Sequence, residues 1–187
     1  NFYGSNIKHI LKDTLQLPND FLILFENDAV CFSKGEVVKN FPDEFERVLA
    51  VTMGTGFGAC FIEHNKIITT DERVPVGGEL YNVPYRSGIA EDFISSRALV
   101  AGYAALTTKA MPNGKAVYTL AKKGEAAALQ AFKDMGMALA DVLQPYLKSF
   151  APQCLIIGGK IADSASYFLP EFEKCLAQQN TDIQIHL

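Results

Sequence analysis

The placement of the glycines is the feature that most constrains the fold of this chain. Seven of the fourteen glycines fall into three clusters: Gly54/Gly56/Gly58, Gly77/Gly78 and Gly158/Gly159. Two of these clusters directly follow apolar runs that predict strands, Arg47–Met53 and Cys154–Ile157. A glycine after a strand lets a phosphate approach backbone amides closely, because it has no Cβ. The clusters therefore predict an α/β fold with a phosphate-binding edge, and ordinary turn glycines are the alternative.

The first cluster, within Gly54–Ala59, also fits the G-x-G-x-x-A fingerprint of dinucleotide-binding folds. That fingerprint must open a helix, so that the phosphate lies at the helix N-terminus. Here the chain continues with Cys60-Phe61-Ile62-Glu63, which predicts a strand. We therefore reject the dinucleotide fingerprint. A glycine loop between two antiparallel strands suits the phosphate loops of the actin and hexokinase superfold.

The remaining pattern alternates helices and strands. Helices are predicted for Ile7–Leu17, Ala29–Val38, Ala90–Leu106, Lys115–Lys122 and a long amphipathic stretch between Gly124 and Phe150, kinked at Pro145. Strands are predicted for Phe21–Phe25, Arg47–Met53, Cys154–Ile157 and Ile183–Leu187, with a hairpin of Ala59–Glu63 and Ile67–Thr70. Phe21–Phe25 is wholly apolar and is expected to be a buried parallel strand. Asp71–Ser87 is expected to be irregular, and Pro42-Asp43 to break the chain. This alternation, with one inserted hairpin, indicates the α/β class.

Charge and composition exclude several classes of function. The net charge is −4 and the basic residues are scattered, which argues against a nucleic-acid surface in this chain. No apolar run approaches the about 20 residues of a membrane span. Nothing at the N-terminus resembles a secretory signal, so a cytoplasmic location and no membrane partner are expected. The chain begins without Met and stops after a strand-like run, and we expect it to be a fragment.

The cysteines and histidines do not suggest a metal site. Four cysteines stand far apart and in no CxxC pair: Cys31, Cys60, Cys154 and Cys175. Four cysteines could form two disulfides, but four reduced thiols fit a cytosolic protein better. The three histidines are also dispersed, so no metal ligands are predicted.

Six segments, taken in order, resemble the ROK family of repressors, open reading frames and kinases. They are Glu26–Ala29 with Lys34–Glu36, Val51–Gly58, Gly77–Leu80, Gly88–Phe93 with Ser96–Leu99, Ala121–Glu125, and Pro152–Gly159. The family counterparts are the "NDAN…GE" segment, the second phosphate loop, the start of "GELGH", the "GCLE" segment, the "A…GD" before a long helix, and a strand with a Gly-Gly turn. The resemblance implies an actin-like ATPase fold, with 1–45 as a remnant of an N-terminal lobe and 46–187 as the C-terminal lobe, truncated at its C-terminal end.

The resemblance also implies a role for each candidate residue. Asp28 is the expected general base for phosphoryl transfer, since the sugar hydroxyl must lose a proton as it attacks. Around the sugar the resemblance places Asn27, Glu79, Asn82 and Glu91; on the nucleotide and its phosphates it places Gly54, Thr55, Gly56, Gly58, Gly158 and Gly159. The alternatives remain that Asp28 caps a helix, and that Glu79 and Glu91 are surface acids, Glu91 also suiting a helix dipole.

The sequence departs from the family pattern at three places. Asn82 stands where the family has the His of "GELGH", which puts the choice of sugar and the metal in doubt. Residues 83–88 contain no Cys, so no structural zinc is expected. The N-terminal "DxGGT" phosphate loop is missing, so we expect ATP with Mg²⁺ to serve the full-length parent while this fragment alone is inactive.

The leading expectation is thus part of an ATP-dependent kinase for a hexose or an N-acetylhexosamine, with a homo-oligomer expected. The runner-up is the sugar-sensing part of a ROK transcriptional regulator without kinase activity, whose DNA-binding head would lie upstream. A third interpretation, an acetate-kinase-like or BadF-type ATPase, is disfavoured by the combination of Asn27-Asp28 with Glu79.

Overall fold

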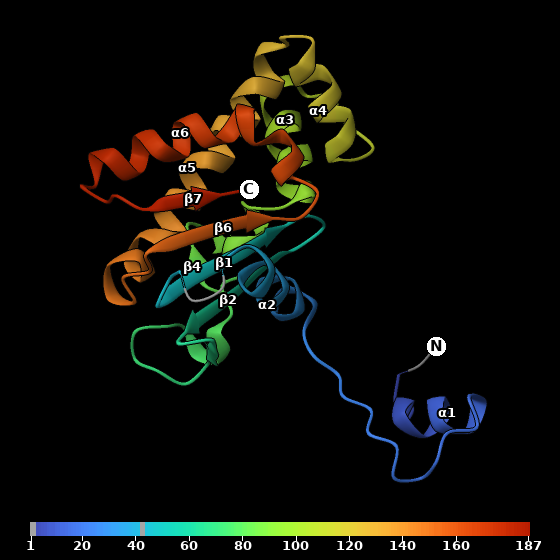
Figure 1. Ribbon diagram of the computed structural model, residues 1–187. Coiled ribbons are helices and arrows are strands. Elements are labelled where there is room, and N and C mark those ends of the chain that lie inside the picture. Colours follow the sequence, from blue (N-terminus) through green and yellow to red (C-terminus); the bar gives the residue numbers. More distant parts are fainter. Residues whose placement is uncertain (1–2, 42–43) are drawn as a thin grey trace.

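A five-stranded mixed sheet forms the centre of the computed structural model, which describes residues 3–41 and 44–187 (Figure 1). The strand order is β3-β2-β1-β6-β7. The strands are β1 (Arg47–Met53), β2 (Phe57–Glu63), β3 (Lys66–Ile68), β6 (Cys154–Gly158) and β7 (Gln184–His186). β2 is antiparallel to β1 and β3, whereas β6 is parallel to both β1 and β7. The predicted central strands and hairpin are confirmed.

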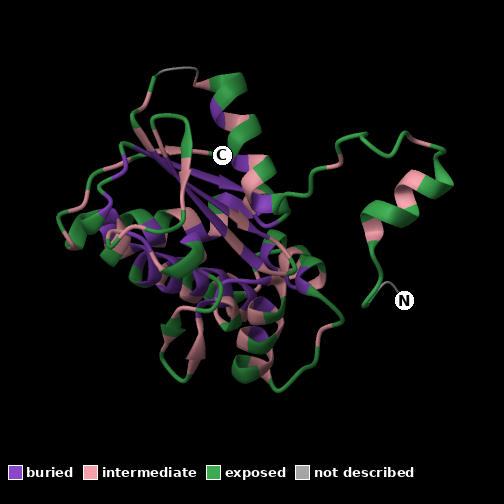
Figure 2. Cartoon of the chain, turned by 90° about the horizontal axis from the view of Figure 1, so that it is seen from below, coloured by how far each residue is buried: buried purple, intermediate pink, exposed green. Residues whose placement is uncertain are grey.

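The central strands are buried on both faces, as their continuous apolar runs predict. On β1, Leu49 and Val51 belong to the large core, whereas Val48 and Ala50 face a smaller one. This is the two-residue alternation of a strand. Figure 2 shows the buried residues concentrated in the sheet and on the helix faces against it.

Helices cover the two faces unequally (Figure 1). α2 (Asp28–Asn40) packs on the smaller core through Val37, against β1 and β2. The larger core is built by α3 (Ser96–Thr107), α4 (Gly114–Lys122), α5 (Ala126–Ser149) and α6 (Ala165–Gln178). Pro145 lies inside α5, which continues to Ser149. Among the described residues, no helix is both long and apolar enough to cross a membrane.

The segment expected to form one helix over Ala90–Leu106 is divided. A 3₁₀ turn, η2 (Ala90–Asp92), precedes α3, which has its own N-cap at Ser95. The Ser95 hydroxyl accepts a hydrogen bond from the Ala98 amide at 3.3 Å, and such a cap starts a new helix. Asp71–Ser87 is mostly irregular as predicted, with η1 (Val76–Gly78) and the short β4 (Pro84–Tyr85), which pairs with β5 (Gly88–Ile89). A further 3₁₀ turn, η3 (Ala162–Ser164), precedes α6.

The N-terminal arm corrects a second prediction. α1 (Ile7–Thr14) forms, but Phe21–Phe25 is neither a strand nor buried, and the arm extends away from the sheet (Figure 1). Leu22 is 74% exposed and Leu24 is 76% exposed. An apolar run becomes a buried strand only where a neighbouring strand supplies hydrogen bonds, and no described strand pairs with this one. The predicted break at Pro42-Asp43 lies outside the described residues.

Candidate functional site

A cavity of about 910 Å³ opens where α2 begins and β1 ends. It is lined by the start of α2, the glycine loop that joins β1 to β2, the loop around Gly77 and the η2 turn. Of the residues predicted for the site, nine line this cavity: Asn27, Asp28, Gly54, Thr55, Gly56, Gly58, Glu79, Glu91 and Gly159. Asn82 and Gly158 are not among the lining residues. Most of the predicted site is therefore brought together by the fold.

The start of α2 presents two candidate side chains to the cavity. Asn27 is the N-cap: its Oδ1 accepts from the Ala29 amide at 2.9 Å and the Val30 amide at 3.3 Å. Asp28 is the first residue of the helix, and its Oδ1 also accepts from the Ala29 amide, at 2.9 Å. The capping role considered for Asp28 thus belongs to Asn27. Asp28 is exposed and lines the cavity. Its carboxylate has further lone pairs that can accept hydrogen bonds besides the one from the Ala29 amide.

The glycine loop makes a tight turn between β1 and β2. The Gly54 amide donates to the Gly56 carbonyl at 2.9 Å, so this amide faces into the turn. The Gly54 carbonyl accepts from the Ser96 amide at 2.8 Å, which ties the loop to the start of α3. Thr55 is exposed at the tip of the loop. Its hydroxyl and the backbone around it are the groups that a phosphate could reach.

Glu91 joins the glycine loop to η2. Its Oε2 accepts from the Phe57 amide at 3.0 Å, and its Oε1 pairs with the Arg97 guanidinium at 2.6 Å. A Cβ on Gly56 would lie 2.6 Å from Glu91 Oε2, so the glycine is required for the close approach of this carboxylate. Glu91 is therefore neither an isolated surface acid nor a residue of the first turn of α3.

The second cluster shapes the loop that carries Glu79. Gly77 and Gly78 both have positive φ, 77° and 70°, which glycine adopts at little cost. A Cβ on Gly78 would lie 2.8 Å from the Ile68 carbonyl oxygen, so the loop lies directly against β3. The turn places Glu79, which is half-buried, on the cavity wall.

Three other predicted glycines have packing roles. A Cβ on Gly58 would lie 2.7 Å from the Ala29 Cβ, where α2 crosses β2. A Cβ on Gly158 would lie 2.1 Å from the Phe32 ring, where α2 crosses β6. Gly159 has φ of 86° and lies close to the Met53 backbone. Gly58 and Gly158 therefore allow α2, and with it Asp28, to lie close to the sheet, whereas Gly159 allows the close approach of the β6 end to β1.

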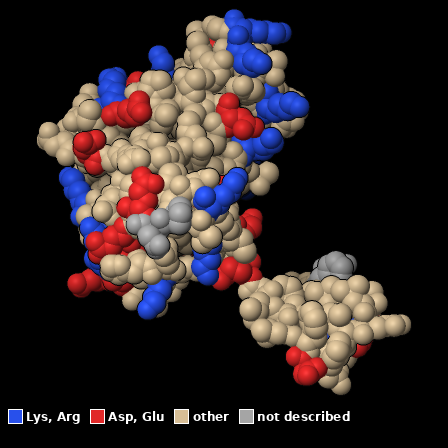
Figure 3. Space-filling model, viewed as in Figure 1, with Lys and Arg blue, Asp and Glu red and all other residues tan. Residues whose placement is uncertain are grey.

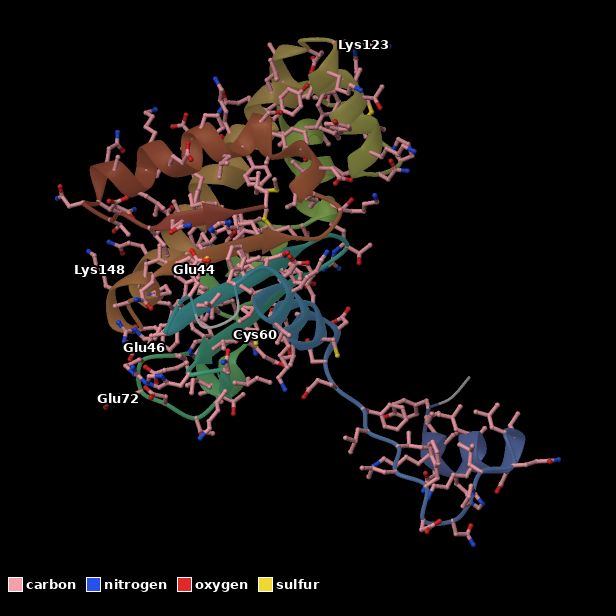
Figure 4. All side chains as sticks on the ribbon, viewed as in Figure 1. Glu44, Glu46, Cys60, Glu72, Lys123 and Lys148 are labelled. Atoms are coloured by element: carbon pink, nitrogen blue, oxygen red, sulfur yellow. The ribbon has the colours of Figure 1, made fainter. Side chains whose placement is uncertain are left out.

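Negative charge dominates the cavity wall. Glu26, Asp28, Glu79 and Glu91 line it, and none of the described lining residues is Lys, Arg or His. On the face of the body drawn in Figure 3, basic residues are scattered among acidic ones. Cys60 also lines the cavity from β2, beside α2 (Figure 4). Burial raises the pKa of its thiol to about 11, against the opposing effect of a hydrogen bond to Ser33. The thiol is therefore neutral near pH 7 and a poor nucleophile.

Sequence reasoning missed several lining residues, notably Glu26, Thr52, Thr69 and Tyr81. The signal for Glu26 was its position directly before Asn27-Asp28. Thr52 lies on β1, one residue before the end of the strand, and its position could have suggested it. Thr69 and Tyr81 belong to segments without a recognisable period, so only the tertiary fold identifies them.

Among the described residues, no group of three or more His, Cys, Asp or Glu side chains could hold a metal ion. The β4–β5 hairpin is held by side-chain contacts. The Tyr85 hydroxyl donates to Asp141 at 2.7 Å, and the Tyr85 and Phe93 rings meet edge to face at 5.0 Å. Arg86 lies over the Tyr85 ring at 4.8 Å. The four cysteines are free thiols.

Comparison with solved structures finds the same fold in sugar kinases and in a transcriptional regulator. A glucokinase from Parabacteroides distasonis is 23% identical, with a TM-score of 0.76, over 94% of this chain and 54% of that one. A ROK family glucokinase from Streptomyces griseus, solved with glucose and AMPPNP, is 21% identical, with a TM-score of 0.74, over 97% and 67%. A ROK family transcriptional regulator, a homologue of the E. coli MLC protein, is 18% identical, with a TM-score of 0.74, over 94% and 49%. No curated protein sequence matches the chain.

These likenesses confirm the predicted α/β class and the actin-like ATPase fold. The chain spans only about half to two thirds of the length of these neighbours. At the level of sequence, the model of the ROK family matches residues 5–185, almost the whole chain. Residues from five of the six family-like segments line one cavity of the matching fold, and this chain belongs to the ROK family.

Proposed function

We propose that this chain is the sugar- and ATP-binding part of an ATP-dependent kinase for a hexose or an N-acetylhexosamine. The observation that carries the proposal is the shared cavity: Asn27, Asp28, Glu79 and Glu91 line it together with the glycine loop at Gly54–Gly56. Carboxylates and an amide suit sugar hydroxyls, and a glycine loop suits a phosphate.

In the proposed reaction, a sugar hydroxyl oxygen attacks the γ-phosphorus of ATP, and ADP leaves. Asp28 accepts the hydroxyl proton, which its exposed carboxylate at the start of α2 is free to do. Asn27 has its Oδ1 engaged in the helix cap, so its NH₂ group is the part that can donate to the sugar. Glu79 and Glu91 accept hydrogen bonds from other hydroxyls of the same sugar.

ATP as the phosphoryl donor is supported by the Streptomyces griseus glucokinase, which holds glucose and AMPPNP. Thr55, Gly54, Gly56 and Gly58 would contact the phosphates, and Gly159 the nucleotide. Gly158 and Asn82 belong to the same proposed segments but lie outside the cavity lining. We expect Mg²⁺ to accompany ATP, yet the described residues gather no three-ligand metal site, so no step above depends on the ion.

The exposed N-terminal arm supports a proposal about the lobes of the longer protein. We propose that residues 1–45 belong to an N-terminal lobe and residues 46–187 to the C-terminal lobe, with the cleft completed only in the longer protein. The apolar arm residues Phe21 and Leu22 are exposed, as expected of a lobe interior without its partner. This chain alone is then expected to show no useful turnover, and self-association could cover the exposed apolar surface.

The likeness to a ROK transcriptional regulator supports a second candidate, a sugar sensor without kinase activity. The TM-score of that likeness, 0.74, equals that of the Streptomyces griseus glucokinase. A sensor would keep the sugar contacts at Glu79 and Glu91 but would not need Asp28 as a base.

Calorimetric titration with glucose, N-acetylglucosamine and N-acetylmannosamine, combined with ATP turnover in the intact parent, tests the proposal. We expect Glu79→Ala to lose sugar binding. We expect Asp28→Asn to lose at least about 100-fold in turnover while still binding sugar. Asp134→Asn, a change at a half-buried residue of α5 that does not line the cavity, is the control and should change neither.

Two results would replace the proposal. Sugar binding without turnover in the intact parent would establish the sensor. Absence of binding for all three sugars would show that the cavity is not a sugar site, and the assignments of Asn27, Glu79 and Glu91 would fall with it.

A further inference from the structure

The first residues of α3 hold both ends of the glycine loop. The Ser96 amide donates to the Gly54 carbonyl at 2.8 Å. The next residue, Arg97, bonds Glu91 Oε1 through its Nη2 at 2.6 Å, and the other oxygen of that carboxylate accepts from the Phe57 amide at 3.0 Å. One hydrogen bond thus holds Gly54, where the loop begins. Two linked hydrogen bonds, through Glu91, hold Phe57, where the loop ends.

The burial of these partners shows which of them is fixed by the fold. The Glu91 side chain is 22% exposed and belongs to the cavity wall, whereas the Arg97 side chain is 70% exposed. Gly56 leaves no side chain between the carboxylate and the loop, since a Cβ there would lie 2.6 Å from Glu91 Oε2. Packing alone brings Glu91 near the loop, and its orientation depends on hydrogen bonds to its two oxygens.

We propose that Arg97 is a positioning residue that orients Glu91 onto the Phe57 amide and thereby couples sugar binding to phosphate binding. The orienting role stands on the contacts alone; the coupling rests on the proposed function. A guanidinium is always charged and holds a carboxylate oxygen in a fixed direction. With Oε1 held by Arg97, Oε2 remains aimed at the loop.

The coupling follows from the position of Glu91 between the two ligands. A sugar hydroxyl that donates to Glu91 further restricts the carboxylate, and the Phe57 contact transmits this restriction to the loop. A phosphate that then binds the ordered loop loses less conformational entropy, which gives positive cooperativity. We expect sugar to tighten nucleotide binding by about fivefold or more, the lower range of measured couplings.

Hydrogen exchange of the Phe57 amide, measured by NMR on the chain without ligands, tests the orienting role. We expect Arg97→Ala to accelerate this exchange by about tenfold or more, because the amide loses its oriented acceptor. Arg97→Lys should restore part of the protection. Lys174→Ala is the matched control, since it removes another exposed cation that pairs with a glutamate, Glu171 at 2.7 Å on α6.

A double variant separates this effect from a general loosening of the chain. Glu91→Gln weakens the charged link to Arg97, so adding Arg97→Ala to it should cause little further acceleration. Equal exchange rates of the Phe57 amide in Arg97→Ala and Lys174→Ala would overturn the orienting role. Additive accelerations of this exchange in the double variant would overturn it as well. The midpoint of urea unfolding should not change in Arg97→Ala, because its side chain is mostly exposed.

The coupling is tested in the intact parent by titrating AMPPNP with Mg²⁺ in the absence and presence of saturating glucose or N-acetylglucosamine. The measured quantity is the AMPPNP affinity with sugar divided by the affinity without sugar. We expect this ratio to fall from about five or more in the wild type to near one in Arg97→Ala, and to stay unchanged in Lys174→Ala. The same ratio in wild type and Arg97→Ala would refute the coupling. If neither ligand binds, the proposed function and the coupling both fall, whereas the exchange experiment still decides the orienting role.

Discussion

Replacement of Gly136 by Ala tests how the two longest helices pack. Gly136 lies within α5, where a Gly-to-Ala change in an isolated helix gains about 1 kcal/mol. In the folded protein, however, a Cβ at this position would lie 2.4 Å from the Phe168 carbonyl oxygen and 3.3 Å from the Phe172 nitrogen, both in α6. These are backbone atoms, so no side chain can rotate away and the two helices must separate.

The two effects have opposite signs, and their sizes decide the outcome. Overpacking of a core costs about 1–3 kcal/mol, and a backbone contact belongs at the upper end of that range. After subtraction of the helix gain of about 1 kcal/mol, Gly136→Ala is expected to destabilise the chain by about 2 kcal/mol. That corresponds to a fall of about 30-fold in the ratio of folded to unfolded protein.

Two other helical glycines provide matched controls. Gly35 in α2 has open space around the position of a Cβ, and Gly102 in α3 has only an ordinary contact of 3.7 Å to the Ala131 Cβ. Gly35→Ala and Gly102→Ala should therefore each stabilise the chain, by up to about 1 kcal/mol. Urea unfolding measures all three variants. A Gly136→Ala protein as stable as the wild type would refute the backbone contact between α5 and α6.

Three further predictions concern α2 and the loop beside β3. Gly158→Ala should destabilise the chain by about 1–3 kcal/mol through the Phe32 ring, and urea unfolding should find most of this cost absent in a Phe32→Ala background. Asn27→Ala should cost about 1 kcal/mol by the same assay, because the Val30 amide loses its cap and the Ala29 amide keeps only Asp28; an unchanged midpoint would contradict the cap. Hydrogen bonds from Arg73 lower the pKa of Asp71 from 3.8 to about 2. The stabilisation by this carboxylate is thus complete above about pH 4 and is lost as the pH falls toward 2, so melting temperatures of Asp71→Asn should fall less than those of the wild type over that range.

The sequence alone predicted the strands of the central sheet, the order of the elements along the chain and nine of the residues that line the cavity. β1 was predicted with its observed bounds, since a continuous apolar run ending in glycines has few other structures. The long helix α5 followed from its apolar stripe. Asn27, Asp28, Glu79 and Glu91 were found by their motifs, and the fold brings all four to one cavity. Their chemical roles remain predictions.

Only the tertiary structure decided the features that depend on partners distant in the sequence. Phe21–Phe25 has the composition of a buried strand, yet it stays exposed because no described strand pairs with it. Gly158 follows a strand like a nucleotide-binding glycine, but its missing side chain makes room for Phe32. The link from Arg97 through Glu91 to Phe57 joins three separate segments. Local patterns favour particular elements, whereas the hydrogen bonds and close contacts between distant segments, which decide whether such an element forms, arise only once the chain is folded.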